Sequence, residues 1–247
     1  MIYKGLVSSD WNECLAPTGP FDPVAFIYPD LKKELDTIFK NYTSNQIPLS
    51  KAVSQIVGLL PKPFSIDQMD AYLERSFAIY NGVSEMIDLL ASKNILFMIN
   101  TTGALGFFQR IIAKKLIPAV PIIASNPFIQ FPGAQTDPRF DYLVSEISDK
   151  GRNTATVIRK HGLLSSRVFL IGDSGGDGPH FSWGSSNGAY LIGSMTKASL
   201  SKYCDTNKIS INKFFGVIYS ENEPRDYERE YEFNFKELGL YILDMIN

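Results

Sequence analysis

The sequence contains very little cysteine. Cys14 and Cys204 are the only two among 247 residues, and they stand far apart with neither a CxxC nor a metal-ligand spacing. A disulfide framework or a structural zinc site needs more cysteines at closer spacing. The sequence therefore argues against both, and we expect two small side chains packed in the interior, where unpaired cysteines usually lie.

An excess of one charge sign and a long apolar run are missing as well. The 24 basic and 26 acidic residues leave a net charge of −2, whereas nucleic acid and anionic membranes usually call for a basic face. No apolar stretch is long enough to cross a bilayer, and the first residues lack the apolar segment and cleavage site of a signal peptide. We therefore expect a cytoplasmic protein that binds neither nucleic acid nor a membrane.

Short apolar runs alternate with amphipathic helical patterns through most of the sequence. The runs that predict strands occupy residues 4–9, 95–99, 120–124, 167–171, 189–193 and 215–219. Continuous apolar strands separated by helices are typical of a parallel sheet built from right-handed βαβ units. The predicted fold class is α/β, with a Rossmann-like parallel sheet covered by helices on both faces.

Helical patterns alone fill the segment between the first two predicted strands. A loop rich in proline and glycine at residues 16–23 leads into it. Ser50 is the expected N-cap of the second helix, and Ser65 with Gln68 forms a capping-box pattern before the third. The apolar positions of the three predicted helices lie within residues 31–42, 53–60 and 69–77.

These patterns divide the chain into two parts. We predict an inserted helical cap at residues 20–80 and an α/β core formed by residues 1–19 and 81–247. Within the core, residues 126–141 contain three prolines and predict an extended excursion. Residues 221–232 carry charges of both signs and predict a solvated loop.

Polar side chains follow three of the predicted strands at the point where each strand ends. Asp10, Thr101 and Asp173 occupy these positions, and Lys150 begins a predicted helix that reaches the same rim. A strand-end aspartate is often only a helix cap, and Thr-Thr-Gly is often only a turn. In an open parallel sheet, however, ligands bind beyond the carboxyl ends of the strands, so the four together predict one shared site.

With these four residues in this order, the sequence resembles the haloacid dehalogenase superfamily of phosphohydrolases. Asp10 falls on the family's first motif, Thr101 on its second and Lys150 on its third, while the fourth is Gly-Asp-Ser-Gly-Gly-Asp at residues 172–177. A shift of one residue would place Thr102 on the second motif instead. The helical insert lies where the small-cap, phosphoserine-phosphatase-like branch of the family has its cap.

The resemblance implies a role for each motif residue. Asp10 would be the nucleophile, because a carboxylate is already ionised at neutral pH and needs no base. The phosphate would be bound by Thr101, Thr102, Gly103 and Lys150. Mg²⁺ would be held by Asp10, Asp173, Asp177 and the backbone carbonyl of Asn12. The implied function is an Mg²⁺-dependent phosphatase that acts on a small phosphorylated metabolite through an aspartyl-phosphate intermediate.

Asn12 departs from the family pattern. In the phosphatase branch an aspartate two residues after the nucleophile protonates the leaving oxygen and then activates water, which an asparagine side chain cannot do. The loss of a general acid–base typically lowers the rate by about 10²–10⁴. The family members that cleave carbon–halogen bonds also lack this aspartate, but they do not need the metal, so the presence of Asp173 and Asp177 favours the metal-dependent reaction.

Several explanations of Asn12 stay open on the sequence alone. The substrate could have a good leaving group, such as an acyl phosphate, or another acid such as Glu13 could replace the missing one. The chain could instead bind a phosphorylated ligand with little turnover, or the sequence could have been altered at this position. We rank a slow or specialised phosphatase first and a phosphate-ligand binding protein second. His180 and Trp11 could each contact substrate, although packing in the interior explains both as simply.

Overall fold

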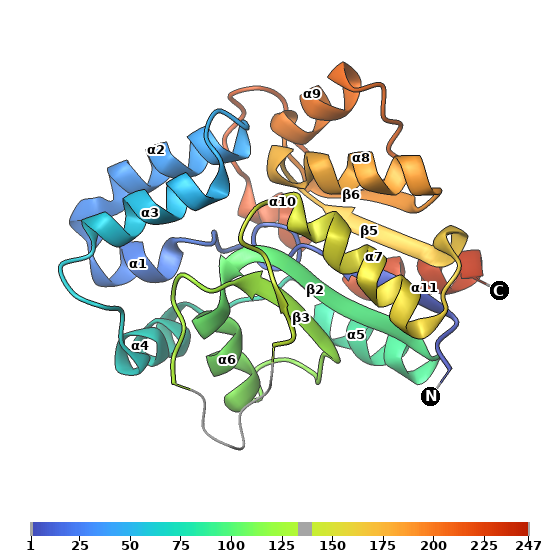
Figure 1. Ribbon diagram of the computed structural model, residues 1–247, viewed down its shortest axis with the longest axis horizontal. Helices are drawn as coiled ribbons and strands as arrows, with labels where there is room; N and C mark the ends of the chain where they lie inside the picture. The colour runs from blue at the N-terminus through green and yellow to red at the C-terminus, as the bar shows by residue number, and fades with distance from the viewer. Residues whose placement is uncertain (1, 133–139, 247) are drawn as a thin grey trace.

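The structure is a computed structural model that describes residues 2–132 and 140–246, and it contains a seven-stranded sheet between two layers of helices (Figure 1). The strand order is β4-β3-β2-β1-β5-β6-β7, and every neighbouring pair is parallel. The first strand therefore lies at the centre of the sheet. The predicted α/β fold class is confirmed.

The strands are buried where the sequence is continuously apolar. Every residue of the central strand and of its two neighbours is buried, as expected for parallel strands covered by helices on both faces. The second strand extends five residues beyond its predicted end at residue 99. The strands are β1 (Gly5–Ser9), β2 (Ile95–Ala104), β3 (Ile122–Asn126), β4 (Tyr142–Leu143), β5 (Val168–Gly172), β6 (Tyr190–Thr196) and β7 (Lys213–Ile218).

Helices cover both faces of the sheet. Helices α5 and α11 pack against each other on one face, and α7 and α8 do so on the other (Figure 1), which agrees with right-handed crossovers on either side of β1. Helices α8 and α9 were not predicted from the sequence. The core helices are α5 (Val83–Ser92), α6 (Leu105–Ala113), α7 (Asp149–His161), α8 (Gly178–Asn187), α9 (Ala198–Thr206), α10 (Tyr227–Tyr231) and α11 (Phe235–Ile246), with short 3-10 helices η2 (Ser165–Arg167) and η3 (Gly175–Asp177).

The segment between β1 and α5 contains four α-helices rather than the predicted three. The additional helix begins inside the predicted loop, because Pro23 lies in its first turn, where a missing N–H group costs nothing. The elements are α1 (Asp22–Ile27), η1 (Pro29–Leu31), α2 (Lys32–Thr43), α3 (Leu49–Leu59) and α4 (Ile66–Ser76). The capping box of Ser65 and Gln68 is confirmed at the start of α4.

The predicted N-cap at Ser50 is wrong. Helix α3 begins at Leu49, and Ser50 is its second residue. The cap comes from the core instead, because the Glu146 carboxylate accepts hydrogen bonds from the backbone N–H groups of Leu49 (3.0 Å) and Ser50 (3.1 Å). A carboxylate at a helix N-terminus is favourable both as a hydrogen-bond acceptor and for the helix dipole. This contact ties α3 to the loop before α7.

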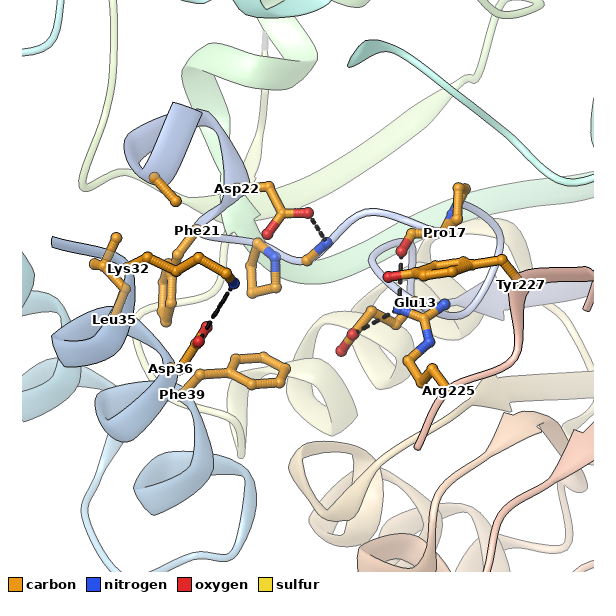
Figure 2. Close-up of a pocket in the computed structure, with 13 residues that line it drawn as sticks. Glu13, Pro17, Phe21, Asp22, Lys32, Leu35, Asp36, Phe39, Arg225 and Tyr227 are labelled. Atoms are coloured by element: carbon orange, nitrogen blue, oxygen red, sulfur yellow. Dashed lines mark hydrogen bonds and ion pairs between the residues drawn. The ribbon is translucent and has the colours of Figure 1, made fainter. Parts of the chain in front are cut away.

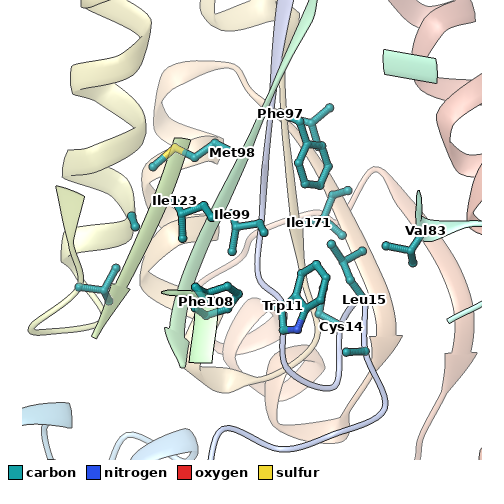
Figure 3. Packing of buried hydrophobic residues seen from close by; sticks show 14 of the residues in the cluster. Trp11, Cys14, Leu15, Val83, Phe97, Met98, Ile99, Phe108, Ile123 and Ile171 are labelled. Atoms are coloured by element: carbon teal, nitrogen blue, oxygen red, sulfur yellow. The ribbon is translucent and has the colours of Figure 1, made fainter. Parts of the chain in front are cut away.

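The interior around β1 is packed mainly with aliphatic and aromatic side chains (Figure 3). Trp11 is fully buried and meets Phe108 edge to face, with ring centroids 5.9 Å apart. Cys14 and Cys204 are unpaired and buried. Packing therefore explains Trp11 and both cysteines.

The prediction of a solvated loop at residues 221–232 is wrong in part. Residues 227–231 form α10, and Glu230 is fully buried. The guanidinium of Arg225 contacts both oxygens of Glu230 at 2.6 and 3.0 Å, which allows a charged side chain to leave water. Sequence reasoning missed this pair because mixed charge usually indicates a solvated face.

Two further expectations concern residues 126–141 and membrane-spanning helices. The predicted excursion at residues 126–141 includes residues 133–139, which lie outside the described part of the chain. None of the helices in the described ranges combines the length and the apolar character that a membrane crossing would require.

Candidate active site

The carboxyl ends of β1 and β5 place two aspartates side by side. Asp10 follows the last residue of β1, and Asp173 follows the last residue of β5. The backbone N–H of Asp10 donates to the carbonyl of Ile171 at 2.9 Å, which fixes the two strand ends against each other. Lys150 comes from the first turn of α7 and reaches the same rim.

Three buried carboxylates converge at this rim. One oxygen each of Asp10, Asp173 and Asp177 lies within 4.8 Å of the others. Burial raises the pKa of Asp10, and burial together with the neighbouring carboxylates raises the pKa of Asp173 well above its usual range. Such crowding of like charges is costly unless cations compensate for it.

Lys150 compensates for two of the three carboxylates. Its Nζ lies 2.6 Å from Asp177 Oδ1 and 3.0 Å from Asp10 Oδ2, and the lysine is almost completely buried. Burial alone would lower the pKa of Lys150, but Asp10 and Asp177 outweigh burial and raise it. The buried amine therefore stays charged. The backbone carbonyl of Lys150 also accepts a hydrogen bond from the Asn100 side chain at 2.9 Å.

Asp177 is held in place by the turn of the fourth motif. Its Oδ2 accepts a hydrogen bond from the backbone N–H of Asp173 at 3.0 Å, and it forms a capping box with Ser174 at the start of η3. The second carboxylate oxygen is thereby left for Lys150. A Cβ on Gly172 would lie 2.6 Å from the Asp177 side chain, so glycine at this position lets Asp177 pack against the end of β5.

The end of β2 places the two threonines in different surroundings. The pairing of β2 with β3 shifts register between Asn100 and Ala104, an irregularity that redirects side chains near functional sites. The Thr101 hydroxyl donates to Asn12 Oδ1 at 3.4 Å and accepts from the backbone N–H of Gly103 at 3.1 Å. The Thr102 hydroxyl instead lies 3.1 Å from the hydroxyl of Tyr42 in α2.

The Asn12 side chain is held by hydrogen bonds to Thr18 and Thr101. Its Nδ2 donates to the carbonyl of Thr18 at 3.2 Å, and its Oδ1 accepts from Thr101. A Cβ on residue 103 would collide with this same Oδ1, so only glycine fits at Gly103 while Asn12 keeps its position.

A second group of charged side chains joins the site, and sequence reasoning missed two of its three members. Lys197, directly before α9, places its Nζ 3.0 Å from Asp173 Oδ2 and pairs with Glu13 Oε2. The other oxygen of Glu13 accepts from Arg225 Nη1 at 2.8 Å. The position of Lys197 just past β6 was a usable signal, because that strand ends at the same rim as β5.

Glu13 cannot act as a substitute general acid at neutral pH. Burial raises its pKa, but Lys197 and Arg225 outweigh burial and hold the pKa below its usual range. The carboxylate therefore remains ionised at neutral pH and has no proton to donate. This geometry argues against one of the explanations of Asn12.

His180 belongs to the interior rather than to the reacting groups. Its Nε2 lies 2.9 Å from the Thr154 hydroxyl, and its ring stacks on Trp183. Burial lowers the pKa of His180 to about 3, so the imidazole is neutral. Packing explains this residue.

The acidic cluster suits a hard divalent cation. Its donors are carboxylate oxygens, which Mg²⁺ prefers. Asp173 Oδ2 is buried and accepts no hydrogen bond from the described residues; Lys197 lies at 3.0 Å as an ion pair, but not in hydrogen-bonding geometry. Asp173 therefore contributes a buried oxygen with an open lone pair to the cluster.

A small cavity lies between the loop after β1, helices α1 and α2, and the segment of Arg225 and Tyr227 (Figure 2). Its volume is about 150 Å³, and both charged and aromatic side chains line it. Glu13 and Arg225 form one wall, whereas Asp10, Lys150 and Asp173 lie outside the lining. The lining also includes Phe21, Asp22, Lys32, Asp36 and Phe39.

Known proteins share this fold but have little sequence in common with the chain. No protein-family model matches the sequence, and no curated protein matches it. A phosphoserine phosphatase with a phospho-aspartyl intermediate analogue is similar at a TM-score of 0.68 and 15% identity, over 97% of this chain and 99% of that one. A substrate-bound phosphoserine phosphatase is similar at 0.64 and 18%, over 86% and 95% of the two chains.

A HAD family hydrolase from Salmonella enterica subsp. enterica serovar Typhi is similar at a TM-score of 0.69 and 13% identity, over 99% of this chain and 72% of that one. At these identities the likeness establishes architecture rather than activity. The chain has the fold of the haloacid dehalogenase (HAD) superfamily hydrolases, in its phosphoserine-phosphatase-like form.

Proposed function

We propose that the chain is a phosphatase that hydrolyses a small phosphorylated metabolite through an aspartyl-phosphate on Asp10. The observation that carries the proposal is the contact between the buried Asp10 carboxylate and Lys150, 3.0 Å apart at the end of the central strand. An ionised carboxylate is a ready nucleophile, and a fixed ammonium beside it can stabilise the charge of a transferring phosphoryl group.

The proposed reaction has two steps. An Asp10 oxygen attacks phosphorus, the bond between phosphorus and the leaving oxygen breaks, and the leaving group departs with the electron pair. Water then attacks the phosphorus of the aspartyl-phosphate, which releases inorganic phosphate and restores the carboxylate. In both steps Lys150, the Thr101 hydroxyl and the backbone N–H groups of residues 102 and 103 would bind the phosphate oxygens.

The carboxylates support a divalent cation as the cofactor. Asp10, Asp173, Asp177 and the backbone carbonyl of Asn12 would hold Mg²⁺, which when bound supplies positive charge between the acids and the phosphate. The fit rests on the convergence of the three carboxylates and on the open oxygen of Asp173.

Asn12 limits the substrates that the site would turn over well. With an amide at this position and an ionised Glu13 nearby, no acid among these two can protonate a leaving oxygen. A leaving group that departs without a proton, as from an acyl phosphate, does not need one. We therefore propose a specialised substrate of that class over a simple alkyl phosphate.

The helical segment at residues 20–80 would serve as a cap over the core of residues 1–19 and 81–247. Two contacts place this segment over the motif residues of the core. The Tyr42 hydroxyl lies 3.1 Å from the Thr102 hydroxyl, and the Asn45 side chain donates to the carbonyl of Gly175 at 3.1 Å. A closed cap excludes water from the reacting groups.

Steady-state hydrolysis of acetyl phosphate and p-nitrophenyl phosphate, with and without Mg²⁺, tests the proposal. Activity should require Mg²⁺ and disappear in Asp10→Asn, while Asp244→Asn, at an exposed position on α11, should match the unaltered protein. Metal-independent hydrolysis that survives in Asp10→Asn would overturn the assignment.

A second candidate function is the binding of a phosphorylated ligand with little turnover. Asn12 favours it, because the amide is tied to Thr101 and Thr18 in place of a catalytic acid. A thermal-shift screen of phosphorylated metabolites separates the two. A ligand that stabilises the protein and is recovered unchanged after long incubation would favour binding over catalysis.

A further inference from the structure

Lys197 stands at the acidic cluster in a position fixed by the backbone. Its N–H donates to the carbonyl of Asp173 at 2.8 Å, so its side chain necessarily begins beside that residue. The ammonium lies 3.0 Å from Asp173 Oδ2, pairs with Glu13 and lies over the ring of Phe39 at 5.2 Å. A lysine on the solvated surface would have none of these restraints.

The oxygen that Lys197 faces is the one with an open lone pair. Asp173 Oδ2 accepts no hydrogen bond from the described residues, and its side chain is 2% exposed. The same oxygen can contact the ammonium or a divalent cation at close range, and two cations at one carboxylate oxygen repel each other.

The carboxylates of the site already have cationic partners in the chain. Lys150 contacts Asp10 and Asp177, while Lys197 contacts Asp173 and Glu13. Buried carboxylates without such partners would destabilise the fold strongly. The cluster is thus electrostatically supported without a metal ion, and Lys197 provides that support on the side of Asp173.

We propose that Lys197 is a resident cation that competes with a divalent metal for Asp173. The inference rests on the proposed metal site. The ammonium contacts both Asp173 Oδ2 and Glu13 when no metal is bound, and it gives up Asp173 and keeps Glu13 when a metal enters. The flexible four-carbon stem of lysine permits this movement, and Glu13 keeps a partner for the displaced charge. Lys197 therefore sets the metal affinity of the site.

Titration calorimetry with MgCl₂ on the full chain tests this proposal without any substrate. Lys197→Met removes the charge and keeps most of the apolar stem, so Mg²⁺ should bind at least tenfold more tightly than to the unaltered protein. Lys202→Met is the matched control, because Lys202 is an exposed lysine on α9. Its Mg²⁺ affinity should equal that of the unaltered protein.

Lys197→Gln provides a second variant in case Lys197→Met does not fold. The amide can still donate to Glu13 and Asp173, but it carries no charge, so the same tighter Mg²⁺ binding is expected. Equal affinities in the unaltered protein and in a folded Lys197 variant would overturn the competition and leave the metal site standing. Absence of Mg²⁺ binding in every folded protein would overturn the metal site and this inference with it.

Discussion

The Lys150 ammonium lies 2.6 Å from the Asp177 carboxylate in the interior, where 1% of each side chain is exposed. Lys150 also contacts Asp10, so its loss would leave two carboxylates close together without a shared cation. Breaking a buried ion pair on one side typically costs about 3–5 kcal/mol.

Lys150→Met should therefore lower the free energy of unfolding by about 3–5 kcal/mol. Urea denaturation measures the change. Lys160→Met, at an exposed position on the same helix, should stay within about 0.5 kcal/mol of the unaltered protein. A loss below about 1 kcal/mol in Lys150→Met would mean that the carboxylates do not depend on this lysine.

His180 should make the stability depend on pH. Burial lowers its folded pKa to about 3, from an ordinary value of 6.5. The unfolded chain therefore binds the proton more readily between these values. The stabilisation is complete above about pH 6.5 and is lost as the pH falls toward 3, at up to about 1.4 kcal/mol per unit.

At pH 5 this amounts to about 2 kcal/mol, and His180→Asn should remove that part of the pH dependence. Urea unfolding at a series of pH values between 5 and 7.5 compares the two proteins. His161→Asn is the comparison and should change the pH dependence less than His180→Asn, because burial and Lys160 lower the pKa of His161 only modestly in the last turn of α7. Parallel pH profiles for the unaltered protein and His180→Asn would show that His180 is not the source of this pH dependence.

Asn12→Asp should raise the turnover of substrates with poor leaving groups. The new carboxylic acid would supply the missing proton, and general acid–base catalysis typically raises the rate by a factor of about 10²–10⁴. Loss of the amide donor to Thr18 should cost about 1 kcal/mol of stability.

The measurement is kcat for an alkyl phosphate relative to acetyl phosphate in both proteins. The alkyl phosphate should gain at least tenfold more than acetyl phosphate, because the new carboxylate can activate water for both substrates but protonates only the alkyl leaving group. Equal gains on both substrates would point away from leaving-group protonation.

Arg225 should be essential for the stability of the segment after β7. Its guanidinium contacts both oxygens of the buried Glu230 and also Glu13. Arg225→Met should therefore lower the free energy of unfolding by about 3 kcal/mol, near the lower end for a broken buried pair, because Tyr80 and Tyr219 still donate hydroxyls to Glu230.

The double variant Arg225→Met, Glu230→Gln should lose less than the sum of the two single changes, since it leaves no uncompensated charge. Thermal and urea denaturation of the four proteins give the coupling. Arg229→Met should cost less than about 1 kcal/mol, because Arg229 pairs with Glu223 at the surface. A strictly additive cycle would show that Arg225 and Glu230 act independently.

The sequence by itself determined the α/β class and the residues that meet at the rim. Buried parallel strands require continuous apolar runs, and those runs fixed where Asp10, Asp173 and the threonines would stand. Parallel strands also bring their carboxyl ends to one edge. The meeting of Asp10 and Asp173 at one edge therefore followed from residue order, whereas the contact of Lys150 with Asp177 was not predicted, and the roles of these residues and the division into cap and core stay predictions.

Only the tertiary structure decided how the charges of the site are shared. Arg225 comes from a segment far along the chain and carries no local pattern that links it to Glu13, and the position of Lys197 after β6 indicates the rim but not its pairing with Glu13. Burial and pairing of charges depend on which segments pack together in space, and a sequence pattern reports only one segment at a time. The ionised state of Glu13 and the cation beside Asp173 are therefore properties of the fold.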